Sequence, residues 1–131
     1  MVGQDLSERI SQLQGKSAQF SLGKSFPGFG PTGPLLVTPD EFADPDDLEI
    51  TGFLNGKEVQ HDRTKSMIFP VSELVARLSA VVPLLPGDLV FTGTPAGVGN
   101  RMNPPRYLAE GDELVSRIEG IGEIRQRFVT G

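Results

Sequence analysis

The chain of 131 residues contains no cysteine, no tryptophan, one tyrosine and one histidine. Without cysteine it can form neither disulfides nor thiolate metal centres, and we expect a cytoplasmic protein. No apolar run approaches the roughly 18 residues that a membrane-spanning helix needs, so we expect no membrane partner, and we expect no signal peptide. The net charge of −5 argues against nucleic acid as a partner, because such binding depends on a basic face.

Glycine and proline are abundant instead, at 16 and 11 residues, while hydrophobic residues make up only 37% of the chain. This combination favours many short strands and turns over long helices. The length fits one domain, spanning residues 1–131. We therefore expect a β-rich α+β fold with one clear amphipathic helix.

Two hairpins are predicted from turn chemistry and apolar patterning. Residues 48–53 and 57–63 flank Leu54-Asn55-Gly56, and Asn-Gly is the strongest short hairpin signal. Residues 113–119 and 123–129 flank Gly120-Ile121-Gly122 and form the second pair. His61 lies in the second arm of the first hairpin, where we expect a surface or cross-strand residue.

Two helices are predicted from periodicity. The clear one covers 70–82, with Pro70 in its first turn and Pro83 ending it. Its expected buried stripe consists of Val71, Leu74, Val75, Leu78, Val81 and Val82. A shorter helix is expected over 4–13, and the spacing of Asp5, Arg9 and Gln12 would place these side chains on one face of it.

Two further strands are expected, at 35–38 and at 89–91, and the second leads into a glycine-rich segment. Residues 92–99 combine the hydroxyls of Thr92 and Thr94 with a backbone that has little side-chain cover. Hydroxyls and open N–H groups suit a carboxylate or another small oxyanion. The alternative is a loop that only turns a corner, and the local pattern by itself favours this loop.

Residues 39–47 carry five carboxylates, which raises the possibility of a calcium loop. The central glycine and the closing glutamate of an EF-hand loop are missing, however. We therefore interpret the segment as a solvated acidic turn.

Taken together, four segments in this order and spacing resemble the fumarylacetoacetate hydrolase family. They are Asp5-Leu6-Ser7-Glu8-Arg9-Ile10-Ser11-Gln12, then Gly23-Lys24-Ser25-Phe26 with Gly33-Pro34, then Asn55-Gly56 with Gln60 and Ser66-Met67-Ile68-Phe69, and finally residues 85–99. The resemblance covers nearly the whole chain. It matches about the carboxy-terminal half of the family's catalytic region.

The resemblance implies a mixed β-roll or sandwich that holds a divalent metal, usually Mg²⁺ or Mn²⁺. Members of the family hydrolyse C–C bonds of acylpyruvates, or isomerise, hydrate or decarboxylate related dioates. The expected partner is therefore a small 2-oxo acid or dioate, and the expected assembly is a homodimer.

The same resemblance also implies functions for individual residues. Asp5 falls where the family has one carboxylate ligand of the metal. Arg9 and Gln12 fall at substrate-contacting positions. Lys24 matches the catalytic lysine that stabilises the enolate or oxyanion formed during cleavage, and Thr94 matches a threonine that receives the substrate carboxylate.

The family's remaining metal ligands form a Glu-x-Glu pair upstream of the position of Asp5. We therefore expect this chain to be an incomplete catalytic unit, a carboxy-terminal fragment or one product of a split gene. The alternative is a non-catalytic binding or assembly module that keeps the fold and its dimer surface.

Overall fold

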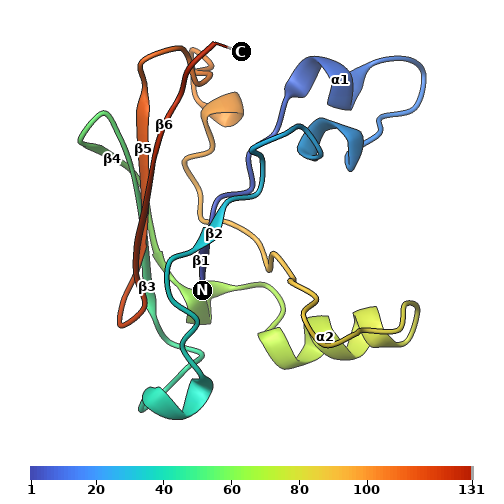
Figure 1. The fold of residues 1–131 in the computed structure, drawn as a ribbon, viewed down its shortest axis with the longest axis vertical. Helices are drawn as coiled ribbons and strands as arrows, with labels where there is room; N and C mark the ends of the chain where they lie inside the picture. The colour runs from blue at the N-terminus through green and yellow to red at the C-terminus, as the bar shows by residue number, and fades with distance from the viewer. Residues whose placement is uncertain (131) are drawn as a thin grey trace.

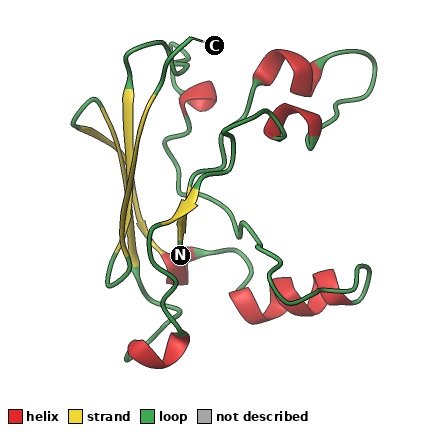
Figure 2. Cartoon of the chain, viewed as in Figure 1, coloured by secondary structure: helices red, strands yellow, loops and turns green. Residues whose placement is uncertain are grey.

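Two antiparallel sheets organise residues 1–130, the part of the chain that the computed structural model describes (Figures 1 and 2). The strands are β1 (Val2–Gly3), β2 (Thr32–Gly33), β3 (Glu49–Leu54), β4 (Lys57–Arg63), β5 (Glu113–Ile118) and β6 (Gly122–Arg127). The α-helices are α1 (Arg9–Leu13) and α2 (Val71–Ser79). Short 3-10 helices cover Leu22–Lys24, Pro39–Glu41, Thr64–Ser66 and Gly99–Arg101. The expected mixed α+β class is confirmed.

The larger sheet has the strand order β4-β3-β5-β6 and confirms both predicted hairpins. In the first, Asn55 and Gly56 both have positive φ, at 51° and 78°, as a tight turn that follows the twist of its strands requires. In the second, Gly120 has φ of 72°, and a Cβ there would lie 2.5 Å from the Phe42 ring. Local turn chemistry therefore fixes both strand pairs.

The small sheet β1-β2 lies against β5 and β6 and closes the core. Val2 of β1, Leu48, Ile121 and Ile124 form the buried apolar cluster. Half-buried residues packed against this cluster are Val37, Phe42 and Ile118. The two α-helices lie on the other side of the small sheet from the larger one, α1 at one end and α2 at the other (Figure 1).

The helix α2 is shorter than the predicted 70–82, and its apolar stripe is not buried. Pro70 caps it, and the helix ends after Ser79. Of the six stripe residues, Leu74 is half-buried and the other five are exposed. Periodicity identifies the apolar side of a helix but not what covers that side. Across residues 1–130, no helix has both the length and the apolar character to cross a bilayer.

The predicted strands at 35–38 and 89–91 are wrong. Both segments are irregular, and the only strand pairing near the first is made by Thr32 and Gly33 with β1. A strand needs a neighbour to pair its N–H and C=O groups. Residues 89–91 have no strand beside them in the described part of the chain, and the Phe91 ring instead approaches Gly3.

The predicted helix over 4–13 begins only at Arg9 and ends at Leu13. Glu8 caps its start, because its carboxylate accepts the N–H groups of Ile10 and Ser11 at 2.7 and 2.6 Å. Hydrogen bonds from Ser11, and then from Ile10, lower the pKa of Glu8. Asp5 therefore precedes the helix. The prediction that Asp5, Arg9 and Gln12 share one face of a helix is wrong, because only Arg9 and Gln12 are helical.

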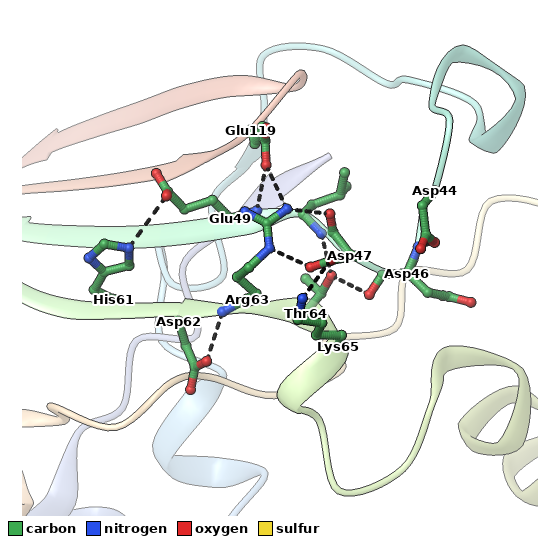
Figure 3. A network of polar contacts seen from close by, with 11 residues as sticks. Asp44, Asp46, Asp47, Glu49, His61, Asp62, Arg63, Thr64, Lys65 and Glu119 are labelled. Carbon is green, nitrogen blue, oxygen red and sulfur yellow. Dashed lines mark hydrogen bonds and ion pairs between the residues drawn. The ribbon is translucent and has the colours of Figure 1, made fainter.

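A surface network joins the acidic loop to both hairpins (Figure 3). Asp47 accepts hydrogen bonds from Arg63 and from Lys65, and these two lower its pKa. Arg63 also pairs with Glu119 at 3.2 Å. His61 faces Glu49 on the neighbouring strand at 3.4 Å, as the cross-strand interpretation predicts. The carboxylate of Asp47 thus forms ion pairs with cationic side chains of the protein itself.

Candidate active site

A cavity of about 900 Å³ lies between the start of the chain, the face of the larger sheet and the segment that follows Phe91. Residues on its wall include Asp5, Arg9, Lys24, Gln60 and Thr94. They come from four separate parts of the sequence. The structure therefore brings four of the five sequence-predicted site residues to one cavity, and the fifth, Gln12, is not among its lining residues.

Lys24 and Asp5 form the closest charged contact in the cavity. Lys24 Nζ donates to Asp5 Oδ2 at 2.5 Å and to Ser7 Oγ at 2.9 Å. The side chains remain 34% and 46% exposed. An ion pair this open contributes at most about 1 kcal/mol to stability, so the contact serves the fold little and stays accessible to a ligand.

The packing of Gly23 on α1 brings Lys24 to this position. A Cβ at Gly23 would lie 2.5 Å from Gln12 Cβ and 2.7 Å from the Glu8 carbonyl oxygen. The Glu8 N–H donates to the Gly23 carbonyl at 2.7 Å, which locks the two segments together. Only glycine fits here, and the next residue is the lysine that reaches the cavity.

Arg9 and Gln12 form a pair in which only the arginine faces the cavity. Arg9 NH1 donates to Gln12 Oε1 at 2.6 Å. Gln12 is 1% exposed, and its Nε2 has no hydrogen-bond partner among residues 1–130. The glutamine is thus buried beside the arginine and does not line the cavity, and its expected contact with the substrate stays a prediction.

Thr94 reaches the cavity from the glycine-rich segment and is held there by a strand residue. Gln60 on β4 donates from Nε2 to Thr94 Oγ1 at 2.9 Å. Gln60 belongs to one of the quoted family segments, yet sequence reasoning gave it no role. The sequence signal that could have identified Gln60 is its position in the second arm of the Asn-Gly hairpin, because residues of that arm line the cavity.

The described residues do not make a complete metal centre. Among residues 1–130, no group of three or more His, Cys, Asp or Glu side chains is placed to hold an ion. Asp5 offers one carboxylate, and Mg²⁺ prefers six oxygen ligands in octahedral geometry. A divalent ion at this cavity would thus need ligands that the described residues do not supply.

The comparison with protein families decides the classification. The model described as fumarylacetoacetate (FAA) hydrolase C-terminal matches residues 1–129. The chain belongs to the fumarylacetoacetate hydrolase family. Members of this family are hydrolases and isomerases.

Three similar proteins illustrate the range of the fumarylacetoacetate hydrolase family. A mitochondrial oxaloacetate tautomerase of Homo sapiens is 43% identical over 98% of this chain and 41% of its own length. A candidate HpcE protein from Mycobacterium smegmatis superposes with a TM-score of 0.94 at 62% identity, over 98% of this chain and 47% of that one. A fumarylpyruvate hydrolase from Pseudomonas aeruginosa, in complex with Mn²⁺ and pyruvate, has a TM-score of 0.85 at 32% identity, over 98% of this chain and 53% of that one.

The chain spans less than half of the length of the curated relatives it matches. The similarity in structure extends over nearly all of this chain, which confirms the fold expected from the resemblance. One of these curated relatives is named as an oxaloacetate tautomerase and another, from Sphingomonas, as a 2,4-didehydro-3-deoxy-L-rhamnonate hydrolase, and the Pseudomonas aeruginosa structure contains Mn²⁺.

Proposed function

We propose that this chain contributes to the active site of a metal-dependent hydrolase or isomerase of 2-oxo acids or dioates, with acylpyruvates as the substrate class. The observation that carries the proposal is the cavity shared by Asp5, Arg9, Lys24 and Thr94. Two cationic side chains and a hydroxyl line a space large enough for a small dianion. The fumarylpyruvate hydrolase that binds pyruvate supports this substrate class.

Lys24 is the catalytic residue in this proposal. Cleaving the C–C bond of an acylpyruvate leaves negative charge on an enolate, and a fixed cation nearby stabilises that charge as it develops. The amine of Lys24 is fixed by Asp5 and Ser7 at 2.5 and 2.9 Å. Its hydrogens are thus oriented before the substrate arrives.

Arg9 and Thr94 bind the carboxylate groups of the substrate. A guanidinium matches the geometry of a carboxylate, and Gln12 restricts the orientation of Arg9 from behind. The Thr94 hydroxyl provides a neutral donor from the glycine-rich segment that lines the same cavity. We assign Gln12 a positioning role, because its side chain is buried.

Asp5 would supply one oxygen ligand to Mg²⁺ or Mn²⁺, with the remaining ligands coming from outside this chain. When bound, the ion would polarise the 2-oxo acid group. The chain covers less than half of its curated relatives, which is compatible with a catalytic unit completed by another segment. The Mn²⁺ in the fumarylpyruvate hydrolase supports the choice of ion.

Replacing Asp5 by asparagine is expected to weaken the Mg²⁺ dependence of acetylpyruvate hydrolysis. The apparent Mg²⁺ affinity should fall at least about 10-fold, because a carboxylate ligand is lost. The measurement is the rate of acetylpyruvate loss by the protein completed by the segment that supplies the remaining metal ligands, over a range of Mg²⁺ concentrations, with and without a chelator. Asp46→Asn, an exposed position in the acidic loop, is the control. A variant with unchanged Mg²⁺ dependence would remove Asp5 from the proposal.

The second candidate function is a non-catalytic binding or assembly module. Two observations favour it: among residues 1–130 no group of three or more His, Cys, Asp or Glu side chains is placed to hold an ion, and the apolar side of α2 is exposed. The same titration separates the two functions. Pyruvate binding without any hydrolysis, with or without Mg²⁺ and in the presence of the segment that supplies the remaining metal ligands, would support the module and contradict the enzyme.

We also propose that the chain forms a homodimer through the apolar side of α2. Val75 and Leu78 are each 39% exposed there, and such side chains are normally covered by a partner. Light scattering should give twice the chain mass of 14.1 kDa. Val75→Asp should shift the mass to the monomer, whereas Ser72→Asp on the same helix should not. A monomeric parent chain would contradict the proposal.

A further inference from the structure

We infer that Gln60 is a positioning residue that sets the direction in which Thr94 presents its hydroxyl hydrogen. The inference deepens the proposed function, on which it rests. Gln60 Nε2 lies 2.9 Å from Thr94 Oγ1 and 2.9 Å from the carbonyl oxygen of Pro95. Gln60, Thr94 and Pro95 all line the cavity.

The Pro95 contact fixes the orientation of the Gln60 amide. A carbonyl oxygen can only accept a hydrogen bond, so the side-chain atom facing it is the NH₂ group and not the amide oxygen. The NH₂ group has two hydrogens. One is directed at Pro95, and the second is directed at the oxygen of Thr94.

The direction of the threonine hydrogen follows from this. A hydroxyl has one hydrogen and two lone pairs, and Gln60 occupies a lone pair of Thr94 Oγ1. The hydrogen of Thr94 is therefore free for another acceptor. The cavity also contains the cationic groups of Arg9 and Lys24, so a ligand carboxylate is the acceptor whose charge suits this space.

Two glycines hold Gln60 and the Thr94 segment in register. A Cβ at Gly52, which pairs with Gln60 across β3 and β4, would lie 3.0 Å from Gln60 Oε1. A Cβ at Gly97 would lie 1.8 Å from the Val59 carbonyl oxygen, and Gly97 has φ of 103°. The glycine-rich segment thus rests directly on the β4 backbone beside Gln60.

The strand itself is irregular at this point. The register between β3 and β4 shifts between Gly52 and Phe53, so Gly52 pairs with Gln60 and Phe53 pairs with Glu58. Val59 is the extra residue of this bulge. Bulges redirect side chains next to functional sites, and this one aims the neighbouring Gln60 at Thr94.

The test measures the binding of pyruvate to the full chain in the presence of Mg²⁺, and a ¹H–¹⁵N NMR titration monitors this binding. Gln60→Met keeps the length of the side chain and removes the donor. It should weaken pyruvate binding about 10-fold, as should Thr94→Val. The double variant Gln60→Met/Thr94→Val should bind no more weakly than Thr94→Val alone, because both changes remove the same hydrogen bond to the ligand. Methyl pyruvate, whose ester lacks the negative charge of a carboxylate, should lose less affinity than pyruvate in each of these variants.

The control is Gln126→Met, which changes a glutamine of β6 that does not line the cavity and should leave pyruvate binding unchanged. Should Gln60→Met fail to fold, Gln60→Asn retains the amide but withdraws it by one methylene, and the same loss is expected. Additive losses in the double variant, or unchanged binding in Gln60→Met, would overturn the inference and leave the proposed function standing. Unchanged binding in both Thr94→Val and Arg9→Met, the two residues assigned to the substrate carboxylates, or no binding by the parent chain, would instead overturn the proposed function.

Discussion

Replacing Lys24 by methionine is expected to slow the cleavage of an acylpyruvate by about 100- to 1000-fold. Methionine keeps the length of the side chain and removes the positive charge that faces the developing enolate. The loss should appear in kcat, because the enolate exists only after the C–C bond begins to break. The measurement is steady-state kinetics with acetylpyruvate as substrate, in the protein completed by the segment that supplies the remaining metal ligands.

The fold should tolerate this change. Lys24 pairs with Asp5 in a half-exposed position, where an ion pair is worth at most about 1 kcal/mol. The midpoint of thermal unfolding should therefore move by only a few degrees. Lys16→Met, at an exposed loop position, is the matched control. An unchanged kcat in Lys24→Met would show that Lys24 is not the catalytic residue.

Replacing Asp112 by alanine is expected to lower the free energy of unfolding by about 2–3 kcal/mol. Asp112 is 7% exposed and lies just before β5. Its carboxylate accepts hydrogen bonds from the Asn55 amide at 2.8 Å, from Arg106 at 2.7 Å and from the Ala109 N–H at 2.8 Å. One side chain thus joins the first hairpin turn to the segment that leads into the second hairpin.

Urea unfolding monitored by circular dichroism gives the measurement. Asp46→Ala is the control, because Asp46 is exposed and its side chain makes no hydrogen bond to another part of residues 1–130. Equal losses in the two variants would contradict the role given to Asp112. The loss should be larger than for any of the exposed ion pairs of the surface network.

The same residue makes stability depend on pH. The Asn55 amide, the Ala109 N–H and Arg106 hold the pKa of Asp112 below its ordinary value. A lowered pKa in the folded state stabilises the protein above the unfolded value, which is near 4. This stability is lost as the pH falls from about 4 towards the folded pKa. The slope of stability against pH in this acid range should be shallower in Asp112→Ala.

The two hairpins were predictable because their turns are encoded locally. Asn55 and Gly56 tolerate positive φ at adjacent positions, and few other residue pairs do. The failed strand at 89–91 has the opposite character. Its apolar run is typical of a strand, but a strand also requires a neighbouring strand to pair with. Whether such a neighbour is present depends on the tertiary structure and not on the local sequence.

The site residues divide in a similar way. The spacing of Asp5, Arg9 and Gln12 suggested a helix face, yet the Glu8 cap starts the helix after Asp5. The meeting of Asp5 and Lys24 depends on how Gly23 packs, which no periodicity reveals. It was the resemblance to a family that brought these residues into one hypothesis. Gln60 could be assigned only from coordinates, because its role consists of two hydrogen bonds to a distant segment.

The position of β4 at the margin of the larger sheet has a consequence for motion. Among the strands of residues 1–130, β3 alone pairs with β4, so the residues of β4 can fray by local opening while the β3-β5-β6 ladder stays closed. Such breathing would release Thr94 from Gln60 without global unfolding. The contact between Gln60 and Thr94 is thus carried by an edge strand, and its order can respond to a bound ligand independently of the protein's overall stability.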